Sequence, residues 1–279
     1  MKASVGLNRS RLVALGQVAA LAQKPSDFDF AQHAADEAVT LIRDNGRMLP
    51  LQVPNAARSH VSAAVGGPGT AEALRLIRQD TDVRPDSGVS TGATLGPNTT
   101  PHSQVGLAAV VLGEALEVRN GREFEKALKA RCPAAEVFYF DGRQFQTPIA
   151  EILSAVNRAE KVVVAAYITH RGARQVNVKG TLETSYGLLG PSGRLLQDIL
   201  ADAREKTAVV VFGSPYLIES FPDIETYICT YAMVSTSELS AVKALFGEIQ
   251  NHAKLPVTLP GVAPRGFSLP WPTKQTAQP

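Results

Sequence analysis

The 279-residue sequence has only two cysteines, Cys132 and Cys229, and no Cys-x-x-Cys pair. A disulfide scaffold needs more cysteines, and a zinc or redox site of this type needs two that lie close in sequence. We therefore exclude both classes and interpret the two residues as unpaired, buried thiols. The five histidines show no His-x3-His spacing, and we expect neither a metal nor another cofactor.

Long apolar runs and a strong charge of one sign are also missing. No stretch of about 18 apolar residues occurs, so we expect no transmembrane helix. The formal net charge is only +2, and so small an excess is no sign of a basic nucleic-acid-binding surface. We therefore expect neither a membrane nor a nucleic acid among the partners.

The N-terminal segment permits two interpretations. Arg9 and Arg11 precede the apolar residues 12–15, which is the layout of a secretory signal. Gly16 and Gln17 interrupt that apolar stretch and favour a linker helix instead. The sequence leaves the compartment open.

Apolar strand patterns alternate with helical patterns along most of the chain. The expected strands are 61–65, 105–112, 137–140, 161–168, 208–212 and 225–229, and the expected helices are 70–78, 121–130, 149–156, 192–203 and 237–249. Strands that alternate with helices pair in parallel through crossover helices, and apolar strands need cover on both faces. The sequence thus predicts a three-layer α/β sandwich with a mostly parallel sheet.

This sandwich is expected over residues 55–279, after a helical linker and an edge segment at 1–54. Within the linker, apolar residues recur at three- and four-residue steps over 28–43, which predicts one helix there. Residues 48–51 are expected to run extended. Residues 81–104 are rich in Gly, Pro, Ser and Thr and are expected to form a long loop or an insertion.

One glycine-rich turn invites comparison with nucleotide-binding folds. Gly67-x-Gly69 follows an expected strand and precedes an expected helix, where backbone amides can hold a phosphate. Glu72 stands where the third glycine of the dinucleotide motif would be, and its carboxylate would repel phosphate. We favour an ordinary strand-to-helix turn and keep a nucleotide-binding domain as a lesser alternative.

The densest polar stretch of the chain follows the expected strand 161–168. It contains His170, Arg171, Arg174 and Glu183. Parallel α/β sheets bind ligands at the carboxyl ends of their strands. We therefore interpret these four residues as a contact surface for a ligand or a neighbouring domain, with an ordinary solvated loop as the alternative.

Two stretches of the sequence resemble the C-terminal domain of family 3 glycoside hydrolases. The first runs from the apolar strand through Gly213-Ser214-Pro215-Tyr216 to a helix before Phe246-Gly247 and the ending Leu255-Pro256-Val257-Thr258-Leu259-Pro260. The second is 38–46, followed by Leu49-Pro50-Leu51. The resemblance implies the same α/β sandwich fold, and it is closer to the β-N-acetylhexosaminidase type than to the β-glucosidase type.

In that family a separate barrel domain carries the nucleophilic Asp and most of the sugar pocket. The resemblance therefore implies a non-catalytic C-terminal domain, with no catalytic residue in this chain, of a glycosidase that acts on β-linked terminal sugars. Its partner would be the catalytic barrel, and His170, Arg171, Arg174 and Glu183 would face the barrel or its carbohydrate. An alternative is a binding or scaffold module that docks a separately encoded barrel. A periplasmic or secreted parent enzyme is compatible with either hypothesis.

Overall fold

The structure is a computed structural model of the chain. It describes residues 4, 24–52, 105–113, 116–142, 147–168, 174–178, 181–185, 187–188, 190–249 and 253–272. Several predicted features lie outside these residues: the strand at 61–65, the Gly67-x-Gly69 turn, the helix at 70–78 and the loop at 81–104. The division of the chain at residue 54 stays a prediction.

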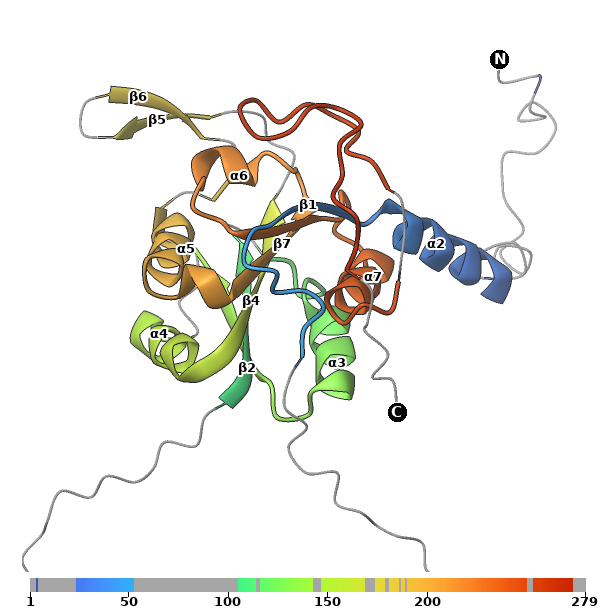
Figure 1. Cartoon of the computed structure of the whole chain (residues 1–279), viewed down its shortest axis with the longest axis horizontal. Helices are drawn as coiled ribbons and strands as arrows, with labels where there is room; N and C mark the ends of the chain where they lie inside the picture. The colour runs from blue at the N-terminus through green and yellow to red at the C-terminus, as the bar shows by residue number, and fades with distance from the viewer. Residues whose placement is uncertain are drawn as a thin grey trace, which may run out of the picture. The chain divides into compact units, whose positions relative to one another are not determined.

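Six strands form one open sheet in the order β1-β8-β7-β4-β2-β3 (Figure 1). They are β1 (Thr40–Asp44), β2 (Val105–Gly113), β3 (Glu136–Asp141), β4 (Ala159–Ile168), β7 (Thr207–Gly213) and β8 (Thr226–Cys229). Strands β3, β2, β4, β7 and β8 run parallel, whereas β1 is antiparallel to β8. The mostly parallel sheet predicted from the sequence is confirmed.

Helices cover both faces of this sheet (Figure 1). The helices are α3 (Arg122–Arg131) and α7 (Ser235–Leu245) on one face, and α4 (Ile149–Arg158) and α5 (Gly190–Ala203) on the other. Because side chains alternate along a strand, Val164 of β4 packs in one core cluster with Leu196, and Val163 packs in the other with Phe124. The three-layer sandwich is thus confirmed, with two separate hydrophobic cores.

One prediction about the N-terminal region is wrong. Residues 28–43 do not form a single helix, because α2 (Pro25–Ala38) ends and β1 begins at Thr40. Leu41 and Ile42 are buried in opposite core clusters, as expected for successive residues of a strand. Pairing with β8 and burial on both faces therefore override the local helical period. The edge strand is β1, and 48–51 contains no strand.

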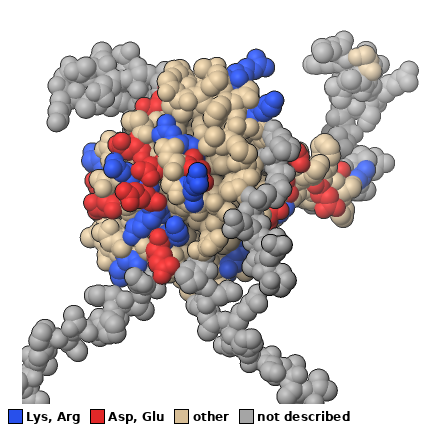
Figure 2. All heavy atoms as spheres, in the orientation of Figure 1, with Lys and Arg blue, Asp and Glu red and all other residues tan. Residues whose placement is uncertain are grey.

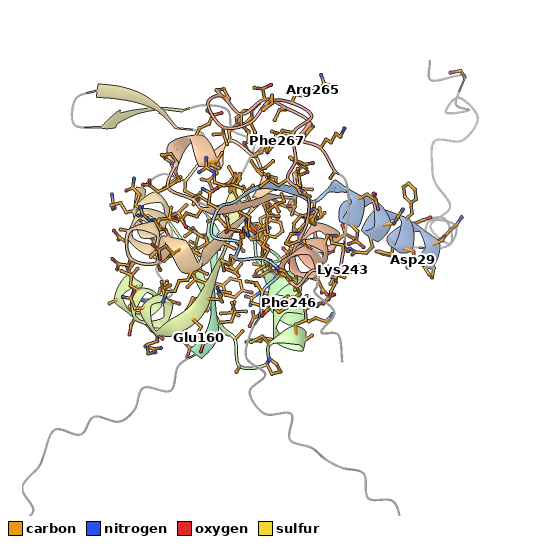
Figure 3. All side chains as sticks on the ribbon, in the orientation of Figure 1. Asp29, Glu160, Lys243, Phe246, Arg265 and Phe267 are labelled. Carbon is orange, nitrogen blue, oxygen red and sulfur yellow. The ribbon has the colours of Figure 1, made fainter. Side chains whose placement is uncertain are left out.

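Polar side chains attach α2 to the sandwich. Gln32 Nε2 donates to Ser240 Oγ at 2.8 Å. Lys243 of α7, labelled in Figure 3, forms an ion pair of 2.7 Å with Asp36. Burial alone would raise the pKa of Asp36, but the hydrogen bonds from Lys243, Ser240 and Gln32 outweigh it and lower that pKa. The carboxylate of Asp36 is therefore held in its charged form against α7.

The open side of β1 is covered by the C-terminal tail. Leu269 N–H donates to the carbonyl oxygen of Leu41 at 2.9 Å. Earlier in the tail, Leu255 and Leu259 are buried in the core cluster beneath α4 and α5, whereas Leu269 packs against the other cluster. The tail thus passes around the edge strand, which removes part of an edge that would otherwise be open to pairing with other chains.

A buried carboxylate joins α3, α7 and β4. Glu238 of α7 is only 2% exposed. Its oxygens accept the backbone N–H groups of Gly121 and Glu123, each at 2.9 Å, and of Phe124 at 3.0 Å, together with the Tyr167 hydroxyl at 2.7 Å. Burial, and then the charge of Glu238, raise the pKa of Tyr167 well above its ordinary value. One side chain of a different helix therefore accepts the N–H groups at the start of α3 that have no partner within that helix.

We expect Glu238→Gln to lower the free energy of unfolding by about 3 kcal/mol, because an amide has one acceptor oxygen and turns its NH₂ toward backbone donors. Urea unfolding followed by circular dichroism measures this change. The matched control is Glu248→Gln, which weakens the partly exposed ion pair with Arg131 and should cost less than about 1 kcal/mol. Equal losses in the two variants would contradict the role assigned to Glu238.

Candidate functional site

The order of the strands defines a topological switch point at the carboxyl edge of the sheet. Strands β2 and β4 are parallel neighbours. The chain leaves β2 toward α3 on one face and leaves β4 toward α5 on the opposite face. Connections that diverge from adjacent strands open a crevice at their carboxyl ends, where doubly wound folds bind ligands. The segment after β4, which the sequence singles out, begins at this crevice.

At the end of β2, groups of the chain itself are in close contact. Gly113, the last residue of β2, has a carbonyl oxygen that accepts the Ser192 hydroxyl at 2.8 Å and the Gly142 N–H at 3.1 Å. The Leu116 side chain lies so close that a Cβ on Gly113 would meet it at 2.7 Å. Asp141 in turn accepts the Leu116 N–H at 2.9 Å. Because Leu116 covers the end of β2, this position does not suit a phosphate.

The structure describes the predicted contact residues only in part. His170 and Arg171 lie outside the described residues, and Arg174 and Glu183 are described by their backbone. The prediction of a loop here is wrong in one respect, because the segment contains an antiparallel hairpin of β5 (Arg174–Val178) and β6 (Thr181–Ser185). Arg174 pairs with Ser185, and Glu183 pairs with Val176.

The sequence contained a signal for this hairpin. The two strands are separated by the two residues Lys179-Gly180, a length typical of tight hairpin turns, and polar and apolar residues alternate over 175–178. The hairpin forms its own two-stranded sheet, apart from the six-stranded one (Figure 1). An isolated two-stranded hairpin is marginally stable in water, so this segment gains from a surface to pack against.

Glu219 is the carboxyl group near this edge that sequence reasoning missed. It lies on the short helix α6 (Leu217–Ser220), directly after β7. Its Oε1 atom is buried and has no hydrogen-bond partner among the described residues, and burial raises the pKa of the carboxyl. Such a group can hold a proton above the usual pH for Glu. With 26 acidic residues in the sequence, no local pattern distinguished this one.

The cysteines, possible metal ligands, helix lengths and surface charges of the described residues indicate no further site. Cys132 and Cys229 are unpaired and buried, as predicted, and burial raises the pKa of both thiols. Over the residues that the structure describes, no three His, Cys, Asp or Glu side chains converge on a metal position, and no helix has the length and apolarity to cross a membrane. On the face shown in Figure 2, basic and acidic side chains are interspersed.

Comparison with solved structures shows what the fold is similar to. One similar structure is a fungal multi-domain family 3 β-N-acetylglucosaminidase with a GCN5-related glucosamine N-acetyltransferase region, at a TM-score of 0.52 and 16% identity, over 86% of this chain and 20% of that one. Another is a β-glucosidase from Erythrobacter marinus, at a TM-score of 0.50 and 16% identity, over 90% of this chain and 36% of that one. No family model and no curated protein matches the chain.

Similarity at this level of identity establishes the fold. The chain spans 20% and 36% of the lengths of these two enzymes, so it corresponds to one part of each. The fold implied by the sequence resemblance is confirmed. The chain is thus an α/β sandwich with the fold of one part of a family 3 glycoside hydrolase.

Proposed function

We propose that this chain is the non-catalytic α/β sandwich domain of a glycoside hydrolase that acts on β-linked terminal sugars. The observation that carries the proposal is partial coverage: two sugar-cleaving enzymes contain the same fold within much longer chains. In this proposal a catalytic barrel, covalently joined or separately encoded, supplies the nucleophile and most of the sugar pocket.

The state of the described carboxylates supports a non-catalytic role. Glycosidases need two carboxyl groups that flank the scissile bond and can reach the sugar. Here Glu238 accepts three backbone N–H groups and a hydroxyl, and Asp141 accepts the N–H of Leu116. Asp44 accepts the Met48 N–H and the Thr226 hydroxyl, each at 2.9 Å. These three carboxylates serve the scaffold, whereas burial raises the pKa of the Glu219 carboxyl.

We further propose that the segment 169–186 faces the catalytic barrel or its carbohydrate through His170, Arg171, Arg174 and Glu183. Two observations support this placement. The segment leaves the sheet at the switch point between β2 and β4, and its hairpin belongs to a sheet of its own. A hairpin of this kind is stabilised by docking against a partner.

The isolated chain is expected to show no turnover of para-nitrophenyl β-glucoside or para-nitrophenyl N-acetyl-β-glucosaminide, because the proposed nucleophile lies in the barrel. The assay follows nitrophenolate release by purified chain over several hours. Glu219→Gln serves as the matched control for a contaminating hydrolase. Turnover that disappears in Glu219→Gln would show that the chain catalyses by itself and would contradict the proposal.

Replacing residues 174–185 by a short glycine linker is expected to leave the sandwich folded, because among the described strands β5 and β6 pair with each other and with none of the six-stranded sheet. The melting temperature of the isolated chain should change by less than about 3 °C, which corresponds to under about 1 kcal/mol. In the enzyme assembled with its catalytic domain, the same replacement should lower kcat/KM at least about tenfold, a loss of about 1.4 kcal/mol.

The matched control for this experiment is Arg265→Ala, in the exposed loop of the C-terminal tail. This substitution should change neither the melting temperature of the isolated chain nor the kcat/KM of the assembled enzyme. An assembled enzyme that works equally well without the hairpin would argue against a partner-facing segment, whatever the stability of the isolated chain.

A further inference from the structure

A groove of about 690 Å³ lies between the turn that follows β1 and the end of the C-terminal tail. This volume falls within the range of about 300–1,000 Å³ that is typical of small-molecule sites. The groove is separate from the carboxyl-edge segment discussed above. Its lining residues are Leu41, Asp44, Arg47, Leu49, Pro50, Gln52, Leu269, Pro270, Trp271 and Pro272.

Hydrogen bonds to the sandwich fix both walls of this groove. On the tail side, Leu269 N–H donates to the Leu41 carbonyl at 2.9 Å. On the turn side, Leu51 N–H donates to the carbonyl of Leu245 at 2.7 Å, and the Asp44 carboxylate accepts the Met48 N–H at 2.9 Å. The groove is therefore formed before any ligand arrives, which lowers the entropic cost of binding.

The polar side chains of the groove are few and planar. Arg47 has a φ of 47°, in the left-handed region that residues other than glycine rarely adopt, and its N–H donates to the Asp44 carbonyl at 3.3 Å. Such backbone positions concentrate at binding sites, where the surrounding structure maintains them. The Arg47 guanidinium and the Gln52 amide can each donate two hydrogen bonds to neighbouring oxygens.

The balance of charge and apolar surface restricts the ligand. One guanidinium and one carboxylate leave the groove without net charge, so it has no excess of positive charge to hold a phosphate. A purely apolar ligand would strip water from Arg47 and Gln52 without replacing their hydrogen bonds. Trp271 and Pro50 supply flat apolar surface. The lining therefore suits a neutral molecule with one apolar face and a rim of hydroxyl groups.

We propose that this groove is a non-catalytic binding site for a neutral β-linked disaccharide. The pyranose C–H face would lie against the Trp271 side of the groove, and the hydroxyl groups would accept hydrogen bonds from Arg47 and Gln52. The choice of a β-linked sugar among neutral polyhydroxyl ligands rests on the proposed function. The existence of a binding site is inferred from the groove alone, and binding there needs no barrel.

Trp271 is the only tryptophan of the chain, so its fluorescence reports on this groove alone. The full chain is titrated with cellobiose and with N,N′-diacetylchitobiose, and maltose serves as the α-linked control. We expect a saturable change in Trp271 emission with at least one of the β-linked disaccharides and at least about tenfold weaker binding of maltose. Arg47→Ala and Gln52→Ala should each weaken binding about fivefold or more, measured by calorimetry.

Arg265→Ala, on the same tail but outside the groove, is the matched control and should bind like the natural sequence (Figure 3). The proposal is overturned if neither β-linked disaccharide gives a saturable signal, if maltose binds equally well, or if Arg47→Ala and Gln52→Ala bind unchanged. These outcomes are independent of the hydrolysis assay. A chain that hydrolysed glucosides unaided would refute the proposed function and leave the groove's binding intact.

Discussion

The structure depends on covering both faces of a parallel sheet. Strands β2, β4 and β7 are buried along most of their length, and a parallel connection must cross from one end of the sheet to the other. Such crossovers are right-handed. Whether the next parallel strand is added on one side or the other of the previous strand therefore decides which face the connecting helix covers. The crossovers then place α3 on the face opposite α4 and α5, and they create the switch point between β2 and β4.

Polar groups inside this arrangement are used to hold it together. Glu238 ties α7 to the start of α3 and to β4, and Asp44 ties the edge strand to the turn after it. A buried carboxylate with several donors around it is costly to disturb, because each donor would lose its partner. Carboxylates whose oxygens already accept several hydrogen bonds from the protein are poorly suited to catalysis. Function in this chain is therefore expected at its edges: the hairpin beyond β4 and the groove beside β1.

The sequence predicted those strands and helices in which the spacing of apolar residues agrees with the side chains that are buried. The near-continuous apolar run of β4 and the spacing of Phe124, Ala127 and Leu128 in α3 are examples. Features that depend on distant partners were not predicted. Strand β1 needs β8 beside it, and the cap on α3 comes from Glu238, more than a hundred positions along the chain. Glu219 became distinctive only once its burial was known.

The hairpin is an intermediate case. A two-residue connection and an alternating pattern were visible in the sequence, but the high polarity of the segment favoured the prediction of a loop. Of the four candidate contact residues, Arg174 and Glu183 belong to the hairpin. The contact role of all four stays a prediction.

Amide hydrogen exchange on the isolated chain tests most directly whether this is a self-sufficient sandwich that carries a partner-dependent hairpin. Exchange rates report the free energy needed to open each segment. We predict the slowest exchange in β2, β4 and β7 and fast exchange throughout β5 and β6. Protection of β5 and β6 equal to that of β4 would contradict this account, because the hairpin would then be part of the stable core.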